Sequence, residues 1–253
     1  MVFLETLFVA LSTYSSLPMP QFEWNEKNMR YAICCFPAVG LLCCGLLLLW
    51  NWFCGMMQVN AVLFAAVAVC LPLLITGGIH MDGYMDTVDA LASHQSRERK
   101  LEILKDSTCG AFAVLYCGVY LLLHFGLFFS VYESGVVVSY ALVYVLSRAL
   151  SALCAVTMPN ARKAGMLCAF TEKAQKKRAS AAMLTLVVVT AFGLLCVDPA
   201  CGGFAVVASA CSVLGYRHMA KKQFGGVTGD TSGFFLQICE LAALVGVWLG
   251  GLV

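Results

Sequence analysis

Residues 59–89 read VNAVLFAAVAVCLPLLITGGIHMDGYMDTVD, and this stretch joins a long apolar run to three closely spaced acids. The apolar run ends at Ile75, a glycine pair follows, and Asp82, Asp86 and Asp89 come next. Spacings of four and three residues place the three carboxylates on one helical face, within an arc of roughly 60°. The stretch therefore predicts a membrane helix that leads into an acidic helical face at the edge of the bilayer.

The composition of the whole chain is typical of a membrane protein. Of its 253 residues, 61% are hydrophobic and 12% are charged, and the mean hydropathy is +0.85. A soluble domain carries about twice that share of charge, and several apolar runs reach the roughly 20 residues that cross a bilayer as a helix. We therefore expect an all-α, polytopic transmembrane bundle, folded as a single domain over residues 1–253, in contact with the lipid bilayer. No basic block interleaved with aromatic residues indicates nucleic-acid binding.

The apolar runs predict seven spans and one shorter helix before them. The predicted spans are residues 31–50, 59–78, 109–131, 136–157, 181–198, 202–219 and 232–252. Residues 2–17 are apolar but too short to span, and Glu5 interrupts them. They predict an interfacial or re-entrant helix that Pro18 and Pro20 end.

Basic residues fall in alternate joins between the predicted spans. Joins 51–58, 132–135 and 199–201 contain no Lys or Arg. The other joins, or the span ends beside them, hold Arg97, Arg99, Lys100, Lys105, Arg162, Lys163, Lys173, Lys176, Lys177, Arg178, Arg217, Lys221 and Lys222. The alternation places these joins and the N-terminus in the cytoplasm and the C-terminus outside. An eighth span made from the first helix would move only the N-terminus.

The acids on the predicted helical face indicate a metal site. Like charges this close repel one another unless a cation or a proton intervenes, and ionisable groups at membrane depth are usually functional. A site made of carboxylate oxygens suits Mg²⁺, with Mn²⁺ as the alternative. Asp82, Asp86 and Asp89 are the predicted ligands, and Asp106, at the end of the surface segment RERKLEILKD, is added to them. His80 is a candidate base or supporting partner of this site.

Further residues indicate phosphate binding near these acids. Arg148 lies in the middle of a predicted span and needs an anion, for which we expect a carboxylate of the acidic face or a substrate phosphate. Lys105 stands where the chain re-enters the membrane and could face the site. The glycine-rich loop KKQFGGVTGDTSG can direct backbone N–H groups at a phosphate, although it is not a P-loop. The candidate residues of this loop are Lys221, Lys222, Thr228, Gly229, Asp230 and Thr231.

Taken in order, these segments resemble the cobalamin synthases, which are also called adenosylcobinamide-GDP ribazoletransferases. The resemblance covers most of the chain, and its specific signatures are TGGIHMDGYMDTVDAL and FGGVTGDTSG. The other matching segments are LSTYSSLPMP, CFPAVGLL, RERKLEILKDSTCGAFAVL, SRALSAL and PNARKAGM, of which the proline and Ser-Arg segments alone are weak signatures.

The resemblance implies the last assembly step of adenosylcobalamin at the cytoplasmic (inner) membrane. It implies a Mg²⁺-dependent transfer that joins adenosylcobinamide-GDP to α-ribazole or its 5′-phosphate and releases GMP. The three acids would hold Mg²⁺ on the diphosphate, and Arg148 with Lys221 or Lys222 would neutralise phosphate oxygens. One of Asp86, Asp89, Asp230 or His80 would accept the hydroxyl proton, and the sequence does not choose among these four. It also leaves the oligomeric state open, a homo-oligomer included.

Three other kinds of protein are alternatives. A CDP-alcohol phosphotransferase also uses membrane-borne aspartates, but the DGxxAR…GxxxDxxxD pattern is missing after Asp89. A cation transporter would spread its acids through the membrane depth, between inverted repeats, whereas the acids here gather on one predicted side. A purely structural membrane protein leaves the acidic face unexplained.

Overall fold

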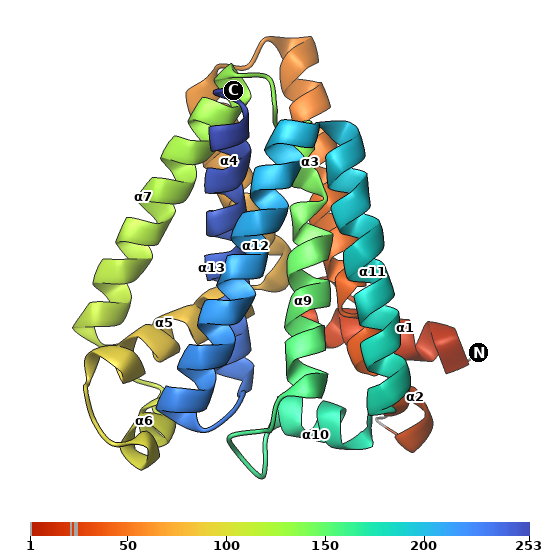
Figure 1. Cartoon of the computed structure of the whole chain (residues 1–253), viewed down its shortest axis with the longest axis vertical. Helices are drawn as coiled ribbons and strands as arrows, with labels where there is room; N and C mark the ends of the chain where they lie inside the picture. Colours follow the sequence, from red (N-terminus) through yellow and green to blue (C-terminus); the bar gives the residue numbers. More distant parts are fainter. Residues whose placement is uncertain (1, 21, 23–24) are drawn as a thin grey trace.

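The computed structural model describes residues 2–20, 22 and 25–253, and almost all of its regular structure is helical. The long helices are α3 (Pro37–Met57), α4 (Ala61–Thr76), α7 (Ala111–Glu133), α9 (Val143–Thr157), α11 (Lys176–Val197), α12 (Pro199–Met219) and α13 (Gly229–Gly250). The shorter ones are α1 (Val2–Tyr14), α2 (Glu26–Ala32), η1 (Ile33–Cys35), α5 (Ile79–Ala92), α6 (Arg97–Ile103), α8 (Val138–Ala141), α10 (Met166–Lys173) and the π-helical turn η2 (Ala220–Phe224). The predicted all-α bundle is confirmed (Figure 1).

Six stretches of the described chain are long and apolar enough to cross a membrane. They are Met29–Met57, Ala111–Glu133, Val138–Thr157, Lys176–Val197, Pro199–Phe224 and Gly229–Gly250. Each contains most or all of one predicted span. The remaining predicted span, residues 59–78, corresponds to α4, which has only 16 residues.

A sharp bend separates α4 from α5. The two helices meet at an angle of 94° across Gly77 and Gly78, whose φ values are +61° and +79°. Glycine adopts this left-handed backbone without steric cost, so the pair ends α4 and turns the chain. Because α5 runs nearly at right angles to α4 and is much less apolar, we treat α5 as lying outside the membrane-spanning segments.

The joins between long helices separate to two ends of the bundle. Helices α6 and α10 and the turn from α12 to α13 lie at one end, α5 runs from the middle of the bundle toward that end, and the C-terminus lies at the other end (Figure 1). The joins from α3 to α4 and from α11 to α12 lie at the end of the C-terminus. The predicted division into joins rich in Lys and Arg and joins without them therefore matches the two ends of the molecule.

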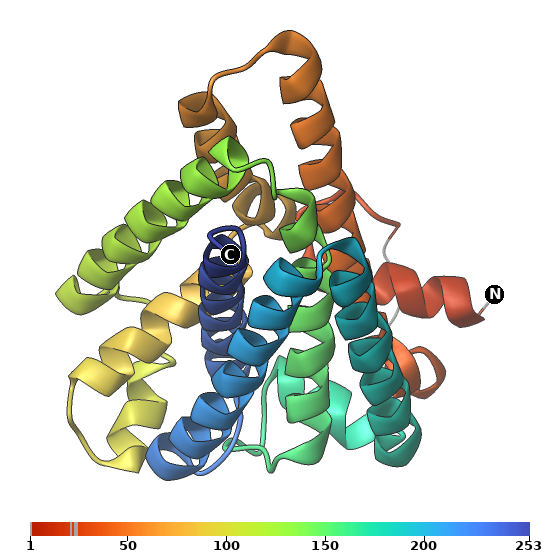
Figure 2. The ribbon, with the colours of Figure 1, turned by 45° about the horizontal axis from the view of Figure 1, so that its top comes forward.

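Helix α1 lies across the bundle and not along it, as Figures 1 and 2 show. It has 13 residues and ends at Tyr14. The chain after it is fixed to the bend, because Ser16 donates from its backbone N to Ile75 O at 2.8 Å and from its hydroxyl to Leu74 O at 2.5 Å. The short N-terminal helix was expected, and the structure places its end against the start of α5.

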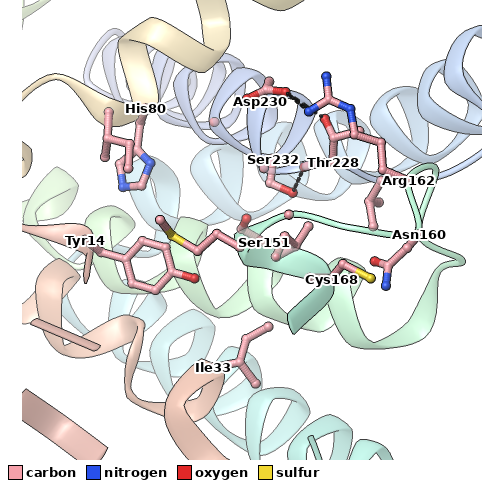
Figure 3. A pocket seen from close by; sticks show the side chains of 18 of the residues that line it. Tyr14, Ile33, His80, Ser151, Asn160, Arg162, Cys168, Thr228, Asp230 and Ser232 are labelled. Carbon is pink, nitrogen blue, oxygen red and sulfur yellow. Dashed lines mark hydrogen bonds and ion pairs between the residues drawn. The ribbon is translucent and has the colours of Figure 1, made fainter. Parts of the chain in front are cut away.

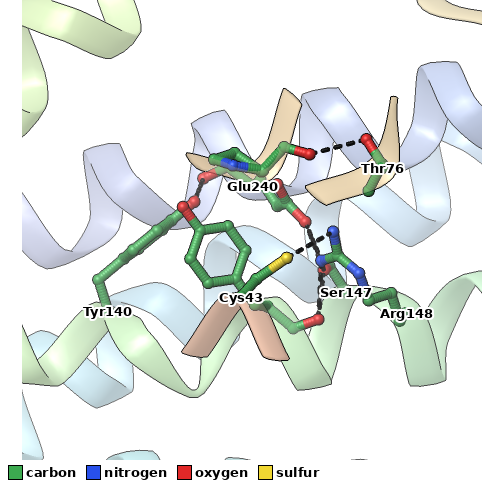
Figure 4. A network of polar contacts seen from close by, with 8 residues as sticks. Cys43, Thr76, Tyr140, Ser147, Arg148 and Glu240 are labelled. Atoms are coloured by element: carbon green, nitrogen blue, oxygen red, sulfur yellow. Dashed lines mark hydrogen bonds and ion pairs between the residues drawn. The ribbon is translucent and has the colours of Figure 1, made fainter. Parts of the chain in front are cut away.

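A buried ion pair stands in the centre of the bundle. Arg148 on α9 donates to Glu240 on α13, and the two side chains are 0% and 1% exposed (Figure 4). Ser147 donates to the same carboxylate at 2.9 Å, and the Arg148 guanidinium also donates to Tyr144 O at 2.9 Å. These bonds satisfy two charges that would be costly alone in an apolar core. The network connects α9 with α13 in the middle of the bundle.

Candidate active site

The candidate site begins where α5 packs against the first turn of α13. A Cβ on Gly83 would lie 2.8 Å from the backbone oxygen of Asp230, and one on Gly233 would lie 2.9 Å from that of His80. Two glycines therefore let the backbones approach closely. As a result the acidic face of α5 stands beside Asp230.

The start of α13 is fixed by a reciprocal cap. The Thr228 hydroxyl accepts from Thr231 N at 3.1 Å, and the Thr231 hydroxyl accepts from Thr228 N at 2.9 Å. This capping box satisfies backbone N–H groups that the helix itself leaves unpaired. It holds Gly229 and Asp230 in the first turn of α13, facing the cavity described below.

The segment after α9 brings an arginine to Asp230. Residues 159–161 pair with Val227, because Val227 N donates to Pro159 O and Ala161 N donates to Val227 O, both at 2.9 Å. This pairing places the Arg162 guanidinium 3.1 Å from the Asp230 carboxylate. Arg162 also donates to Leu101 O at 3.2 Å, whereas its Nε is buried without a hydrogen-bond partner. The guanidinium is thus positioned with donor capacity still unused.

A cavity of about 210 Å³ opens beside this cluster (Figure 3). Its polar lining includes residues of α5, of the start of α13 and of the segment after α9, namely Asp82, Asn160, Arg162, Thr228, Asp230 and Ser232. Ligand pockets are usually larger, about 300–1,000 Å³. The cavity as it stands has room for part of a large substrate.

Negative charge accumulates on the α5 side of the cluster. The pKa of Asp86 is raised to about 7, mainly by burial and also by repulsion from Asp82, Asp230 and Asp89, while Arg162 opposes the rise. Carboxylates that hinder one another's ionisation in this way can bind a divalent cation, because the cation offsets their mutual repulsion. The residues at the meeting of α5 and α13 therefore fit a hard cation chemically.

The three acids of α5 do not share one environment. Asp89 accepts from Gly110 N at 2.6 Å and from Ala113 N at 2.8 Å, so it caps the start of α7. Asp82 is exposed at the cavity, and Asp86 is half-buried between the two. Helical periodicity predicted a shared face, but the start of α7 occupies the Asp89 end of it.

Asp106 lies apart from the other predicted ligands. It is exposed, and its carboxylate accepts from the backbone N of Thr108 at 3.0 Å and from its hydroxyl at 2.7 Å. In the described part of the chain, no three His, Cys, Asp or Glu side chains are already arranged to hold a metal ion. Any ion held by Asp82, Asp86 and Asp230 would need further oxygens from its substrate or a small closure of the site.

His80 lies against aromatic rings at the inner side of the cavity. Only 6% of it is exposed, and its Nε2 is buried without a partner. Burial, with a smaller effect from Arg148, lowers the pKa of His80 to about 3. A neutral imidazole with so low a pKa is a weak proton acceptor at neutral pH.

The predicted basic residues are not at the cavity. Arg148 was expected to meet an acid of α5 or a phosphate, but the structure pairs it with Glu240 because the two helices place them together in the core. Lys105, Lys221 and Lys222 are exposed and do not line the cavity. Arg162 lies at the cavity, where these residues were expected. The sequence placed it only among the basic residues of a cytoplasmic join.

The signal for Arg162 was the segment PNARKAGM, which carries an arginine between Ala161 and Lys163 close after a span. Its role depends on pairing with Val227, which lies 65 or more residues later in the chain. Such a pairing has no periodic signature. The aromatic side of the cavity, which includes Tyr14 and Phe36, was missed for the same reason.

The fold and cavity define a polytopic membrane protein with acids and a guanidinium gathered at one end of its bundle. The family model described as Cobalamin-5-phosphate synthase matches residues 6–248. The chain belongs to this family, as the sequence resemblance indicated.

Curated relatives agree along nearly their whole length. The adenosylcobinamide-GDP ribazoletransferase of Lachnoclostridium phytofermentans is 41% identical over 96% of this chain and 93% of its own length. The protein of the same name from Clostridium botulinum (strain Alaska E43) is 31% identical over 94% of each chain. That of Pseudomonas fluorescens is 31% identical over 96% of this chain and 98% of its own. No solved structure matches the chain.

Proposed function

We propose that this protein is an adenosylcobinamide-GDP ribazoletransferase of the inner membrane, with its site on the cytoplasmic face. It would join adenosylcobinamide-GDP to α-ribazole or α-ribazole 5′-phosphate and give adenosylcobalamin, or its 5′-phosphate, and GMP. The observation that carries the proposal is the meeting of Asp82 and Asp86 with Asp230 and Arg162 beside one cavity. Family membership selects this reaction among those that such a cluster can serve.

The reaction is a displacement at phosphorus. A ribose hydroxyl oxygen forms a bond to the phosphorus on the cobinamide side of the diphosphate, and the bond from that phosphorus to the GMP oxygen breaks. The hydroxyl proton passes to a carboxylate, for which Asp86 and Asp230 are the remaining candidates of our original four. Asp89 is committed to the start of α7, and His80 is a weak base.

Arg162 takes the role that we had given to Arg148 and the lysines. A guanidinium recognises phosphate oxygens through paired donors, and Arg162 has an unpaired Nε beside its contact with Asp230. It would bind the diphosphate and stabilise the charge that develops on the leaving GMP. The contact with Asp230 orients the guanidinium until a phosphate arrives.

Asp82, Asp86 and Asp230 are the residues that would hold Mg²⁺, or Mn²⁺ in its place. The ion would supply charge neutralisation on the diphosphate. This assignment exchanges Asp89 and Asp106 of the original ligand set for Asp230. It is supported by the pKa of Asp86, which burial raises first and repulsion from Asp82 and Asp230 raises in addition.

The test is GMP release by purified protein in lipid nanodiscs given adenosylcobinamide-GDP, α-ribazole 5′-phosphate and Mg²⁺. We expect turnover by the wild type and a loss of roughly 100-fold or more for Asp82→Asn, since a ligand charge is removed. The matched control is Glu102→Gln, which removes an exposed acid of α6 that forms an ion pair with Arg99. No GMP from the wild type would reject the proposed function, and full Mg²⁺-dependent activity of Asp82→Asn would remove that residue from the site.

A further inference from the structure

The cavity beside the acid cluster has a second, mostly apolar end. Its lining there comprises Tyr14, Ile33, Phe36, Ile79, His80 and Ala152. These residues belong to α1, η1, α5 and α9 and to the short link between η1 and α3. One hollow therefore continues from charged groups to a wall of rings and aliphatic side chains.

Three rings form this wall, and we call them the ring pocket: Tyr14, Phe36 and His80. The Tyr14 and Phe36 centroids are 4.6 Å apart, and the Tyr14 and His80 rings are nearly parallel at 6.4 Å. Phe36 meets His80 edge-on at 5.5 Å. Rings in mixed edge and face orientations are the surroundings that a further flat aromatic group prefers.

His80 has a ring nitrogen without a hydrogen-bond partner in this wall. Its side chain is 94% buried, and Nε2 has no partner in the protein. A buried polar atom without a partner costs free energy, and Figure 3 shows the imidazole beside Tyr14 at the cavity. A ligand with a ring nitrogen at that position would complete the bond.

The position of Tyr14 is fixed by the chain that follows it. Ser15 continues the helical bonding by donating to Leu11 O at 2.9 Å, and Ser16 is bound to the end of α4. The α4–α5 bend lies two residues before His80. The same contacts therefore hold Tyr14 and His80 together.

We propose that the ring pocket binds the heterocyclic base of the nucleoside acceptor and so directs its ribose hydroxyl toward the acids. This inference rests on the proposed function, from which it takes the acceptor as a nucleoside. A flat base suits a narrow wall of three rings, whereas a corrinoid is far too large for a cavity of about 210 Å³. The guanine of the other substrate is the rival occupant, but its polar edges would lie unpaired against Ile33, Phe36 and Ala152.

In this proposal, the short N-terminal helix α1 contributes to recognition of the nucleoside acceptor. It forms one wall of the ring pocket, in addition to lying across the bundle. Removing the Tyr14 ring should weaken binding of the acceptor and leave binding of adenosylcobinamide-GDP unchanged.

The test measures the two substrates separately in full-length protein in nanodiscs. Equilibrium dialysis gives the dissociation constant of α-ribazole without the second substrate, and steady-state kinetics gives both KM values. For Tyr14→Leu and His80→Leu we expect the α-ribazole dissociation constant and acceptor KM to rise about tenfold, the scale of one base–ring contact. The KM for adenosylcobinamide-GDP should stay within about twofold. Tyr14→Phe keeps the ring and should bind α-ribazole nearly as the wild type does.

The matched control is Tyr116→Leu, which removes an exposed tyrosine of α7 away from the cavity. Unchanged α-ribazole binding in folded Tyr14→Leu and His80→Leu would overturn the proposal. A rise confined to the KM for adenosylcobinamide-GDP would overturn it too, in favour of guanine. If the wild type binds α-ribazole but releases no GMP, the proposed function fails while the ring pocket stands.

Discussion

The chemistry of this site depends on a few side chains, and the contacts of each side chain determine whether it belongs to the site. The acids on α5 and the aspartate of the glycine-rich loop were found from local spacing and composition. Arg162 was not, because its partner Asp230 is 68 residues later and only the pairing beside Val227 brings them together. Arg148 was expected to pair with an anion, and in the structure it pairs with a carboxylate. Its partner Glu240 could not be selected from spacing, since 92 residues separate the two.

Arg162 should be needed for turnover. Arg162→Ala removes the guanidinium beside Asp230, and we expect kcat/KM for GMP release to fall roughly 100-fold, as for loss of a charged group that stabilises a transition state. Arg162→Lys keeps the charge but not the paired donors, so its activity should lie in between. Arg99→Ala is the control, because Arg99 is exposed and forms an ion pair with Glu102 on the surface of α6. Equal losses in Arg162→Ala and Arg99→Ala would show that Arg162 has no special role.

Breaking the ion pair between Arg148 and Glu240 should destabilise the folded protein. Arg148→Leu leaves a buried carboxylate without its cation, which costs about 3–5 kcal/mol, so the midpoint of thermal unfolding in detergent should fall clearly. Replacing both residues by leucine removes both charges and should restore much of that loss. If Arg148→Leu instead unfolds like the wild type but loses substrate binding, the arginine belongs to the site after all.

At the scale of helices, the lengths of the apolar runs predicted most of the long helices. Glycines mark the place where α4 ends and the chain turns. Most of each predicted span lies within an observed helical stretch, because a helix must be about that long to cross a bilayer. The 94° bend after α4 was not predicted in size, since two glycines at positive φ permit a turn but do not fix its angle. The packing of α5 on α13 fixes that angle, and this packing also assembles the site.

Gly83 should therefore be intolerant of a side chain. In Gly83→Ala the new methyl group would lie 2.8 Å from the Asp230 backbone, which forces α5 away from α13. Displacement of catalytic groups by about 1 Å can cost about 100-fold in rate, so GMP release should fall strongly in protein that still folds. Gly118→Ala on α7 is the matched control, because nothing lies within 4 Å of its new methyl group. Similar activity in the two variants would mean that this close contact does not position the acids.

At the scale of the molecule, the distribution of charge predicts how the bundle sits in the membrane. The joins that hold nearly all the Lys and Arg residues lie at the end where α13 begins, and the first turn of α13 holds Asp230, the partner of Arg162, while the C-terminus lies at the opposite end. Positive joins stay in the cytoplasm. The site should accordingly face the compartment in which nucleotides are made, and the C-terminus should lie outside.

Reporter fusions test this orientation on the full chain. Alkaline phosphatase fused after Val253 should be active, because it folds only outside the cytoplasm, and green fluorescent protein at the same place should stay dark. A fluorescent fusion before Met1 should be bright, since an interfacial α1 leaves the N-terminus inside. A dark N-terminal fusion with an active C-terminal phosphatase would show that α1 crosses the membrane as an eighth span. A bright C-terminal fusion would contradict the whole orientation, and with it the placement of the acid cluster on the cytoplasmic face.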